Sequence, residues 1–202
     1  MAQIDLKRER RQGFTLLETI GVLAVIAVLA ALLLPRIFEA MDRARINQVV
    51  VGCHTIKTAV LQHYANYGEI ASVKGVSVPL SALGHFDHVL LAEGLIDKPF
   101  AVLVGDRTST NTTIRVLAAT DGATAYDLDG DGHDDTTHGQ YLVEAVIAGV
   151  NRSDAIAINE ALDGAAEFLG ANPGGNDNRG RVIYKMPHPK TSADVRIYLT
   201  HR

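Results

Sequence analysis

A run of aspartates in the second half of the chain has the spacing of a metal-binding loop. The nine residues from Asp127 to Asp135 place carboxylates at the first, third, fifth and ninth positions and a glycine, Gly132, at the sixth. These carboxylates belong to Asp127, Asp129, Asp131 and Asp135. In a calcium loop of the EF-hand type, oxygens at alternate positions bind the ion and the glycine allows a sharp turn. The spacing therefore predicts a calcium site, in which His133 would offer its backbone carbonyl oxygen.

This run departs from the EF-hand pattern at the twelfth position. His138 stands there instead of a bidentate glutamate, so another residue, such as Glu144, would have to supply the missing oxygen. The segments on either side of residues 127–135 also look extended rather than helical. A solvated turn rich in aspartate and glycine is the alternative interpretation.

The charge balance of the C-terminal part of the chain favours an ion in this loop. Residues 68–202 contain 11 Lys and Arg residues against 18 Asp and Glu residues, and five of the acidic ones lie within residues 127–135. Their mutual repulsion would be offset by a bound cation. A site of about 10 μM affinity, exposed to millimolar extracellular calcium, would stabilise the folded state by about 2.7 kcal/mol.

The N-terminal part of the chain combines a basic segment with an apolar one. Residues 1–13 contain four basic residues, Lys7, Arg8, Arg10 and Arg11. In the following 21 residues, 14–34, Glu18 is the only ionisable residue. A helix of that length measures roughly 30 Å, which matches the hydrocarbon thickness of a bilayer. The basic cluster predicts that the N-terminus stays in the cytoplasm and that the remaining chain is exported.

Two general interpretations of this apolar segment are less satisfactory. A secretory signal peptide would have a shorter apolar region, and Val28-Leu29-Ala30 offers only a weak cleavage site. A plain uncleaved anchor fits the length but leaves Glu18 unexplained, because an acid deep in lipid costs on the order of 2.5 to 3.5 kcal/mol.

A third interpretation accounts for the unusual residues together. The run Gly13-Phe14-Thr15-Leu16-Leu17-Glu18, followed by an apolar helix with Pro35 at its end, resembles the leader and N-terminal helix of type IV pilins and type II secretion pseudopilins. The resemblance covers about residues 7–60. It implies that a prepilin peptidase cuts between Gly13 and Phe14 and methylates the new N-terminal Phe14. It also implies that Glu18 acts in filament assembly.

The chemistry of these positions agrees with such a role. Gly13 has no Cβ, so a catalytic group can approach its backbone closely. Cleavage would create an α-amino group on Phe14 that is largely cationic, and Glu18 could pair with this amine in its own helix or in a neighbouring subunit. Pro35 predicts a kink or local melting over residues 31–35, and such a hinge would help neighbouring helices to bundle.

The helical pattern continues beyond the apolar segment. Apolar residues recur at three- and four-residue steps, which predicts one long helix over residues 14–67, with Cys53 as a packing residue on its apolar stripe. Residues 68–202 are predicted to form a globular head. Its predicted elements are a short helix within 80–96, strands at 112–120 and 140–150, a helix at 154–162 capped by Ser153 and stopped by Gly164, and a hairpin of 181–186 with 194–200. The expected fold class is α+β: a long N-terminal helix, membrane-spanning in its first half, packed on a head with a small antiparallel sheet.

Composition and motifs exclude several classes of function. A net charge of −4 argues against binding nucleic acid through bulk charge neutralisation. The sequence contains no Walker loop, no G-x-S-x-G motif and no H-E-x-x-H motif, so no enzyme is predicted. His85 and His88 are expected to lie on an exposed helix edge rather than to form a metal pair.

These observations predict a structural subunit of a filament of the type IV pilus class. A type II secretion pseudopilin is the first choice, because a single cysteine cannot form a C-terminal disulfide loop and because an aspartate-rich metal loop is present. A surface type IV pilin is the alternative, and a membrane-tethered, calcium-dependent binding module that never polymerises is a further one. The expected partners are other copies of the chain, the prepilin peptidase, the inner-membrane assembly platform and minor pilins. The chain is expected to span the inner membrane once, with its head in the periplasm or outside and the filament periplasmic or extracellular.

Overall fold

The protein's structure is a computed structural model that describes residues 15–118, 126–136, 141–164, 177, 179–186 and 192–201. The predicted leader 1–13, the predicted cleavage residues Gly13 and Phe14, and His138 lie outside the described residues.

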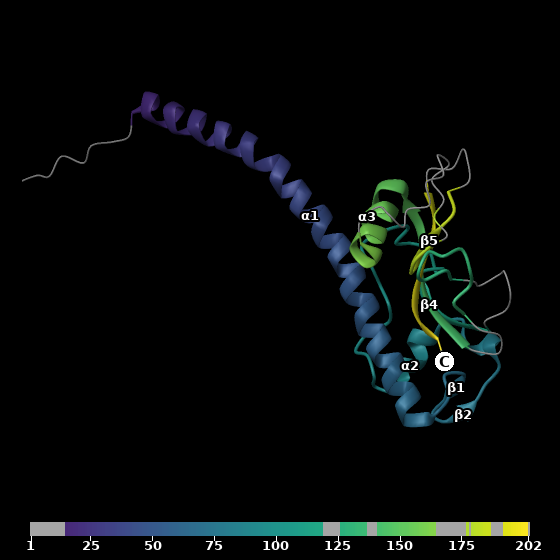
Figure 1. Ribbon diagram of the computed structural model, residues 1–202. Helices are drawn as coiled ribbons and strands as arrows, with labels where there is room; N and C mark the ends of the chain where they lie inside the picture. The colour runs from purple at the N-terminus through teal and green to yellow at the C-terminus, as the bar shows by residue number, and fades with distance from the viewer. Residues whose placement is uncertain are drawn as a thin grey trace, which may run out of the picture. The chain divides into compact units, whose positions relative to one another are not determined.

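The longest element is helix α1, Leu16–Tyr67, which has 52 residues (Figure 1). This confirms the long helix predicted over residues 14–67. The helix continues through Pro35, so the local melting expected over residues 31–35 is not found. Proline removes one backbone hydrogen bond, but the strongly helical flanking residues carry the helix across it. The chain divides within α1 into two compact units, Met1–Asp42 and Arg43–Arg202, so the end of α1 belongs to the unit of the head.

The head is built around a four-stranded antiparallel sheet with the strand order β3-β4-β6-β5. These strands are β3 (Thr113–Ala118), β4 (Tyr141–Asn151), β5 (Val182–Tyr184) and β6 (Ser192–His201). A small hairpin precedes the sheet and consists of β1 (Ser72–Val73) and β2 (Val76–Ser77). Within the described residues the other helices are the 3-10 helix η1 (Leu80–Leu83), α2 (Phe86–Ala92) and α3 (Arg152–Asp163). The predicted α+β class and the predicted final hairpin of β5 with β6 are confirmed.

One apolar core joins the end of α1 to the inner face of the sheet. Helix α1 contributes Val49, Cys53, Ile56, Ala59 and Val60. The sheet contributes Ile114, Val116, Val143, Ala145, Ile147, Val195, Ile197 and Leu199, and α2 and α3 add Phe86, Leu90 and Ile158. The sheet residues alternate along their strands, because successive side chains of a strand point to opposite faces.

The outer face of the sheet is covered in part by the segment that contains the aspartate run. Tyr126, Leu142 and Tyr198 form a second apolar cluster there, with Leu128 packed against it. Strand β4 is consequently buried on both faces over most of its length.

Two local features of the head differ from the prediction. The single helix expected within residues 80–96 is divided into η1 and α2, with Gly84 and His85 between them. Helix α3 is capped by Asn151 rather than by Ser153, because the Asn151 side chain accepts the backbone N–H of Asp154 at 2.8 Å. The Ser153 hydroxyl donates to the same Asn151 oxygen, so it supports the cap instead of forming it.

Candidate functional site

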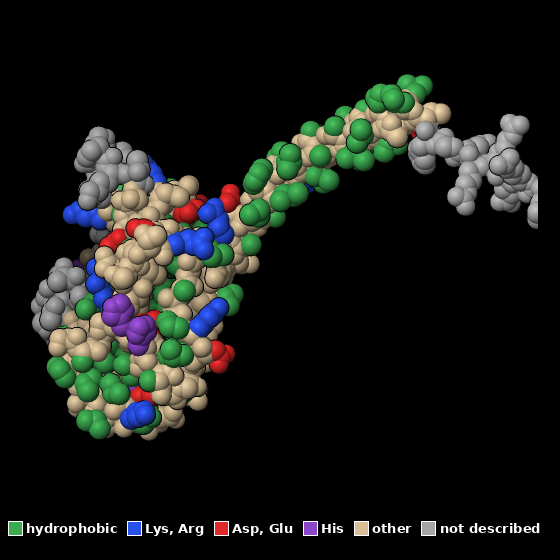
Figure 2. Space-filling model, turned by 180° about the vertical axis from the view of Figure 1, so that it is seen from behind, with side chains coloured by type: hydrophobic (Ala, Val, Ile, Leu, Met, Phe, Trp, Pro, Cys, Tyr) green, Lys and Arg blue, Asp and Glu red, His purple; other side chains and the backbone are tan. Residues whose placement is uncertain are grey.

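The N-terminal part of α1 exposes a continuous apolar surface. Leu17 is 80% exposed, Leu32 68% and Met41 58%, and the other large apolar side chains of this stretch are exposed to similar extents. Figure 2 shows these side chains in green along this part of the helix. In the described part of the chain, α1 is the one helix that is long and apolar enough to cross a membrane. None of its most apolar stretch is buried against the rest of the protein. A surface of this kind requires lipid or other apolar helices around it.

Glu18 lies in the first turn of this helix. Its backbone N–H donates to the carbonyl and to the hydroxyl oxygen of Thr15, at 3.1 and 3.2 Å. The order Thr15-Leu16-Leu17-Glu18 therefore follows the capping-box pattern. A carboxylate in the first turn is also favoured by the positive end of the helix dipole. Glu18 is exposed and forms no ion pair with the described residues, so its charge remains available for an outside partner.

The aspartate run forms a tight loop stabilised by its own carboxylates. Asp127 accepts the N–H groups of Gly130 at 2.7 Å and Gly132 at 2.9 Å, and Asp135 accepts the N–H of Leu128 at 2.6 Å. Gly132 has a φ of 90°, which a residue with a Cβ rarely adopts. The sharp turn in this loop therefore depends on glycine at that position.

Three of the four predicted carboxylate ligands come together in this loop. Oxygen atoms of Asp127, Asp129 and Asp135 lie within 4.8 Å of one another. Asp131 is not in this group, and one of its oxygens accepts the N–H of His133 at 2.8 Å. The donor set is made only of carboxylate oxygens, which calcium prefers.

Glu144 does not serve this loop as a ligand. Its carboxylate is fully buried and accepts from Arg115 Nε at 2.5 Å, from Arg196 Nη2 at 2.8 Å and from the Tyr126 hydroxyl at 2.7 Å. Burial of Tyr126, together with the nearby Glu144 charge, raises the pKa of that phenol well above its ordinary value. Burial is the largest influence on Arg196 and opposes its charge, but the hydrogen bond with Glu144 and the attraction of the Glu144 and Tyr126 charges together outweigh it and raise the pKa of Arg196. Glu144 therefore does not supply the twelfth-position oxygen, because its carboxylate is engaged by Arg115, Arg196 and Tyr126.

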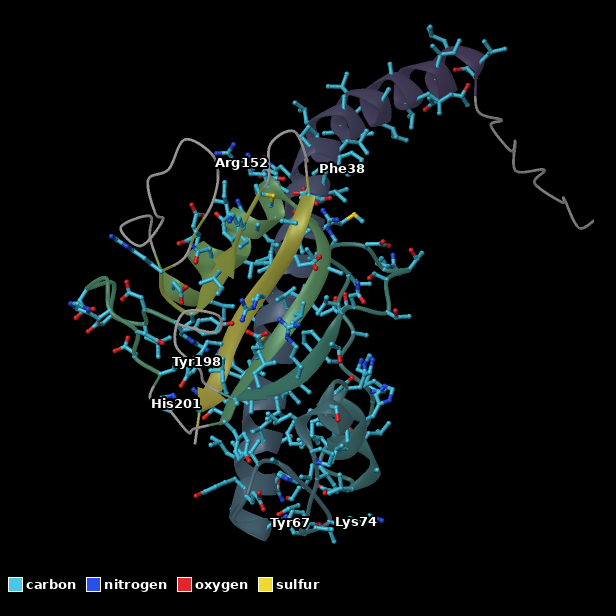
Figure 3. The ribbon with its side chains drawn as sticks, turned by 90° about the vertical axis from the view of Figure 1, so that its right-hand side faces the viewer. Phe38, Tyr67, Lys74, Arg152, Tyr198 and His201 are labelled. Atoms are coloured by element: carbon cyan, nitrogen blue, oxygen red, sulfur yellow. The ribbon has the colours of Figure 1, made fainter. Side chains whose placement is uncertain are left out.

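A buried polar cluster near the end of α1 was not predicted from the sequence. His63 Nδ1 lies 2.6 Å from Glu93 Oε2, and His63 Nε2 lies 3.2 Å from Ser72 Oγ. The order serine, histidine, glutamate is that of a hydrolase triad, but His63 and Ser72 are 0% and 1% exposed. Glu93 also accepts the backbone N–H of Lys74 at 2.8 Å, at the end of the head where Tyr67 and Lys74 lie (Figure 3). The cluster therefore fastens the turn after α1 and offers no nucleophile to a substrate.

Comparisons with known proteins concern the N-terminal segment. Residues 8–34 match the family model described as the prokaryotic N-terminal methylation motif. A fimbrial protein of Neisseria meningitidis serogroup B (strain ATCC BAA-335 / MC58) is 36% identical over 59 residues, which cover 29% of this chain and 35% of the relative. The N-terminal segment of this chain is thus similar to that of type IV pilins and fimbrial proteins. The resemblance found from the sequence is thus confirmed, and the pilin relatives agree with the expectation of a structural protein rather than an enzyme.

Other pilins and fimbrial proteins show the same partial match. The type IV major pilin protein PilE1 of Neisseria gonorrhoeae is 30% identical over 90 residues, 43% of this chain and 42% of the relative. The fimbrial protein EcpB of Eikenella corrodens is 41% identical over 59 residues, 29% of this chain and 37% of the relative. The chain therefore matches about a third to two fifths of the length of these relatives, and no solved structure matches it. Gly13, Phe14 and Glu18 fall within the family-model match, and Pro35 follows its last residue.

Proposed function

We propose that this protein is the structural subunit of a surface filament of the type IV pilus class. The observation that carries this proposal is the exposed apolar surface of α1, which holds one acidic residue, Glu18, within the segment that matches the methylation motif. In this proposal a prepilin peptidase cuts after Gly13 and methylates Phe14. The mature chain then waits in the inner membrane, held by α1, before it joins the filament.

The relatives favour a surface pilus over the secretion pseudopilus that was the first choice from the sequence. The matched proteins are named as fimbrial proteins and type IV major pilins. The earlier preference depended on the single cysteine and on the aspartate loop, and neither feature is specific to a secretion filament. The pseudopilus remains the second candidate, because the leader resembles both kinds of subunit.

Assembly in this proposal depends on the pairing of Glu18 with the amine of Phe14. Lipid tails are as apolar as the leucine side chains of α1, so moving α1 from the bilayer to a helix bundle gives little hydrophobic gain. A carboxylate and an ammonium group in the same apolar region attract each other strongly, because few other groups can solvate them. The pair between neighbouring subunits would therefore set the axial position of one helix against the next.

The test of processing uses protein from native membranes. Intact-mass and N-terminal analysis should find a chain that begins with methylated Phe14, whereas a chain that retains residues 1–13 would refute the proposal. Gly13→Leu should block cleavage, because a bulky side chain prevents close approach of the peptidase. Gly21→Ala is the matched control, since a Cβ at Gly21 has open space around it.

The test of assembly compares two neutralised glutamates on α1. Glu18→Gln should be cleaved normally but should fail to form filaments, as seen by electron microscopy of whole cells. Glu39→Gln makes the same chemical change more than five turns further along α1 and should leave filaments intact. Filaments of normal number and length with Glu18→Gln would remove the assembly role of Glu18.

The same cells distinguish the two kinds of filament. Deletion of the gene should abolish surface filaments while exoprotein secretion continues. Loss of secretion, with surface filaments unchanged, would favour the pseudopilus instead. A processed chain that never leaves the monomeric state in either assay would favour the membrane-tethered binding module.

We also propose that the aspartate loop binds calcium through Asp127, Asp129 and Asp135, with the His133 carbonyl as a further donor. The convergence of three carboxylates supports this proposal, since their repulsion needs a cation to offset it. Calcium at about 100 times its dissociation constant should stabilise the full-length protein by about 2.7 kcal/mol, and a chelator should reverse the shift. Asp129→Asn should abolish the shift, whereas Asp97→Asn, an exposed residue outside the loop, should not. An identical melting temperature with calcium and with chelator would reject the site.

A further inference from the structure

We propose that His85, Asp87 and His88 form a binding site for a divalent transition metal ion of the zinc type. Potential ligand atoms of these three residues lie within 4.8 Å of one another. His85 and His88 are exposed, and their ring centres are 5.4 Å apart. Histidine side chains are visible together on the surface in Figure 2. Both histidines are exposed, as expected, but His85 directly precedes α2 and only His88 lies within it. The expectation also overlooked the carboxylate between the two imidazoles.

Asp87 is the feature that favours a cation. The residue is only 2% exposed, and its two oxygens accept the Phe100 N–H at 3.0 Å and the Thr113 hydroxyl at 3.3 Å. No Lys or Arg in the described part of the chain forms an ion pair with it. A buried carboxylate is normally paired with a cation or coordinates a metal. The two imidazoles beside Asp87 are suited to hold such an ion.

Thr113 supports this arrangement from the neighbouring strand β3. Its hydroxyl oxygen lies 2.9 Å from His85 Nδ1 and 3.3 Å from Asp87 Oδ1. If His85 Nδ1–H donates to Thr113, the hydroxyl can donate onward to Asp87, and His85 Nε2 is left free as a ligand. Metal-binding histidines usually have a partner of this kind on their second nitrogen, which fixes the ring. The ring of His85 is thus oriented before any ion binds.

Two nitrogens and one carboxylate oxygen select the class of ion. This donor set suits zinc and its borderline neighbours, whereas calcium requires oxygen ligands. Ligand atoms around a tetrahedral zinc ion are about 3.4 Å apart, given bonds of about 2.1 Å. The exposed ring of His88 can close the remaining distance by side-chain rotation, while Thr113 holds the ring of His85. Three protein ligands leave a fourth position for water.

The test titrates zinc and cobalt into the untagged full-length protein in detergent micelles, after metal removal and with millimolar calcium present. Zinc should bind with a stoichiometry of one, and cobalt should give the visible absorption of a tetrahedral or five-coordinate site. His85→Gln and His88→Gln should each weaken zinc binding at least about tenfold. His54→Gln is the matched control, because His54 is exposed on α1 and belongs to no cluster of potential metal ligands among the described residues, and it should leave zinc binding unchanged.

Further variants separate this site from a nonspecific one. Thr113→Val should weaken zinc binding about tenfold or more while Thr113→Ser retains it, because only serine keeps the hydroxyl beside His85. Asp129→Asn, which disables the aspartate loop, should leave zinc binding intact. Zinc binding that is unchanged in the double variant of His85 and His88, or that disappears with Asp129→Asn, would overturn the proposal. Absence of zinc binding by the unaltered protein would overturn it as well.

Discussion

Neutralising Glu144 tests how the outer face of the sheet is held together. Glu144→Gln keeps the size of the side chain but removes the charge that faces Arg115 and Arg196. Removing one partner of a buried ion pair costs about 3 to 5 kcal/mol when the other stays buried. The side chains of Arg115 and Arg196 are 37% and 24% exposed, so water reaches them and reduces the cost. We therefore expect a loss of about 2 to 3 kcal/mol.

The assay is unfolding of the full-length protein in detergent micelles, followed by near-ultraviolet circular dichroism of the tyrosines. The chain contains no tryptophan, and two of its six tyrosines, Tyr126 and Tyr198, lie next to the altered charge, so this face contributes to the signal. A loss of that size should lower the melting temperature by roughly 5 to 10 °C. Glu160→Gln is the matched control, because Glu160 is exposed on α3, and it should change the melting temperature little.

A double-mutant cycle identifies the interaction responsible. If the ion pair is the cause, Arg196→Met should cost less in the Glu144→Gln background than in the original protein, with a coupling of about 1 to 3 kcal/mol. Additive effects, or a Glu144→Gln protein as stable as the control, would refute the buried ion pair. If Glu144 were a calcium ligand instead, the substitution would lower calcium affinity and leave the calcium-free stability unchanged.

Two further predictions concern the backbone and the thiol. Gly105→Ala should destabilise the head much more than Gly94→Ala. Both glycines have a positive φ, so both substitutions strain the backbone. A Cβ at Gly105 would also lie 2.3 Å from the Ala148 backbone oxygen, whereas a Cβ at Gly94 would have no atom within 4 Å. Similar melting temperatures for the two variants would contradict this. Burial raises the pKa of the Cys53 thiol from 9.0 to about 12. The unfolded thiol therefore ionises first, so stability should fall by about 1.4 kcal/mol per pH unit above pH 9 relative to Cys53→Ala. Chemical denaturation of the original protein and of Cys53→Ala at pH 8 and pH 10 measures the difference in their free energies of unfolding. A difference that is the same at both pH values would contradict the prediction.

The elements that the sequence predicts well are those defined by neighbours in the chain. Helix α1 is determined by an apolar pattern that repeats every three or four residues, and β6 by simple alternation. The strand order β3-β4-β6-β5 was not predictable, because β4 and β6 are paired between residues such as Ile147 and Val195, far apart in the sequence. Alternation of apolar and polar residues indicates a strand but does not indicate which other strand it pairs with.

The same limit applies to caps and ligands. Asn151 and Ser153 are both good capping residues, and the choice between them depended on where β4 ends, since Asn151 is also its last residue. In the aspartate loop, the spacing indicated which residues could face an ion but not where each carboxylate points. Asp131 is turned toward the His133 N–H, a local alternative that the spacing cannot reveal.

The head and the exposed part of α1 depend on different interactions. The head is specified by a large apolar core, in which the end of α1 takes part, so it folds through burial in water. The exposed part of α1 has no such driving force, because its leucines are in equally apolar surroundings in lipid and in a bundle of apolar helices. A polar contact can distinguish these two surroundings, and among the residues from Leu16 to Leu34 the only ionisable side chain is that of Glu18. If assembly is selective, the selectivity must therefore depend on Glu18 far more than on the many apolar residues around it.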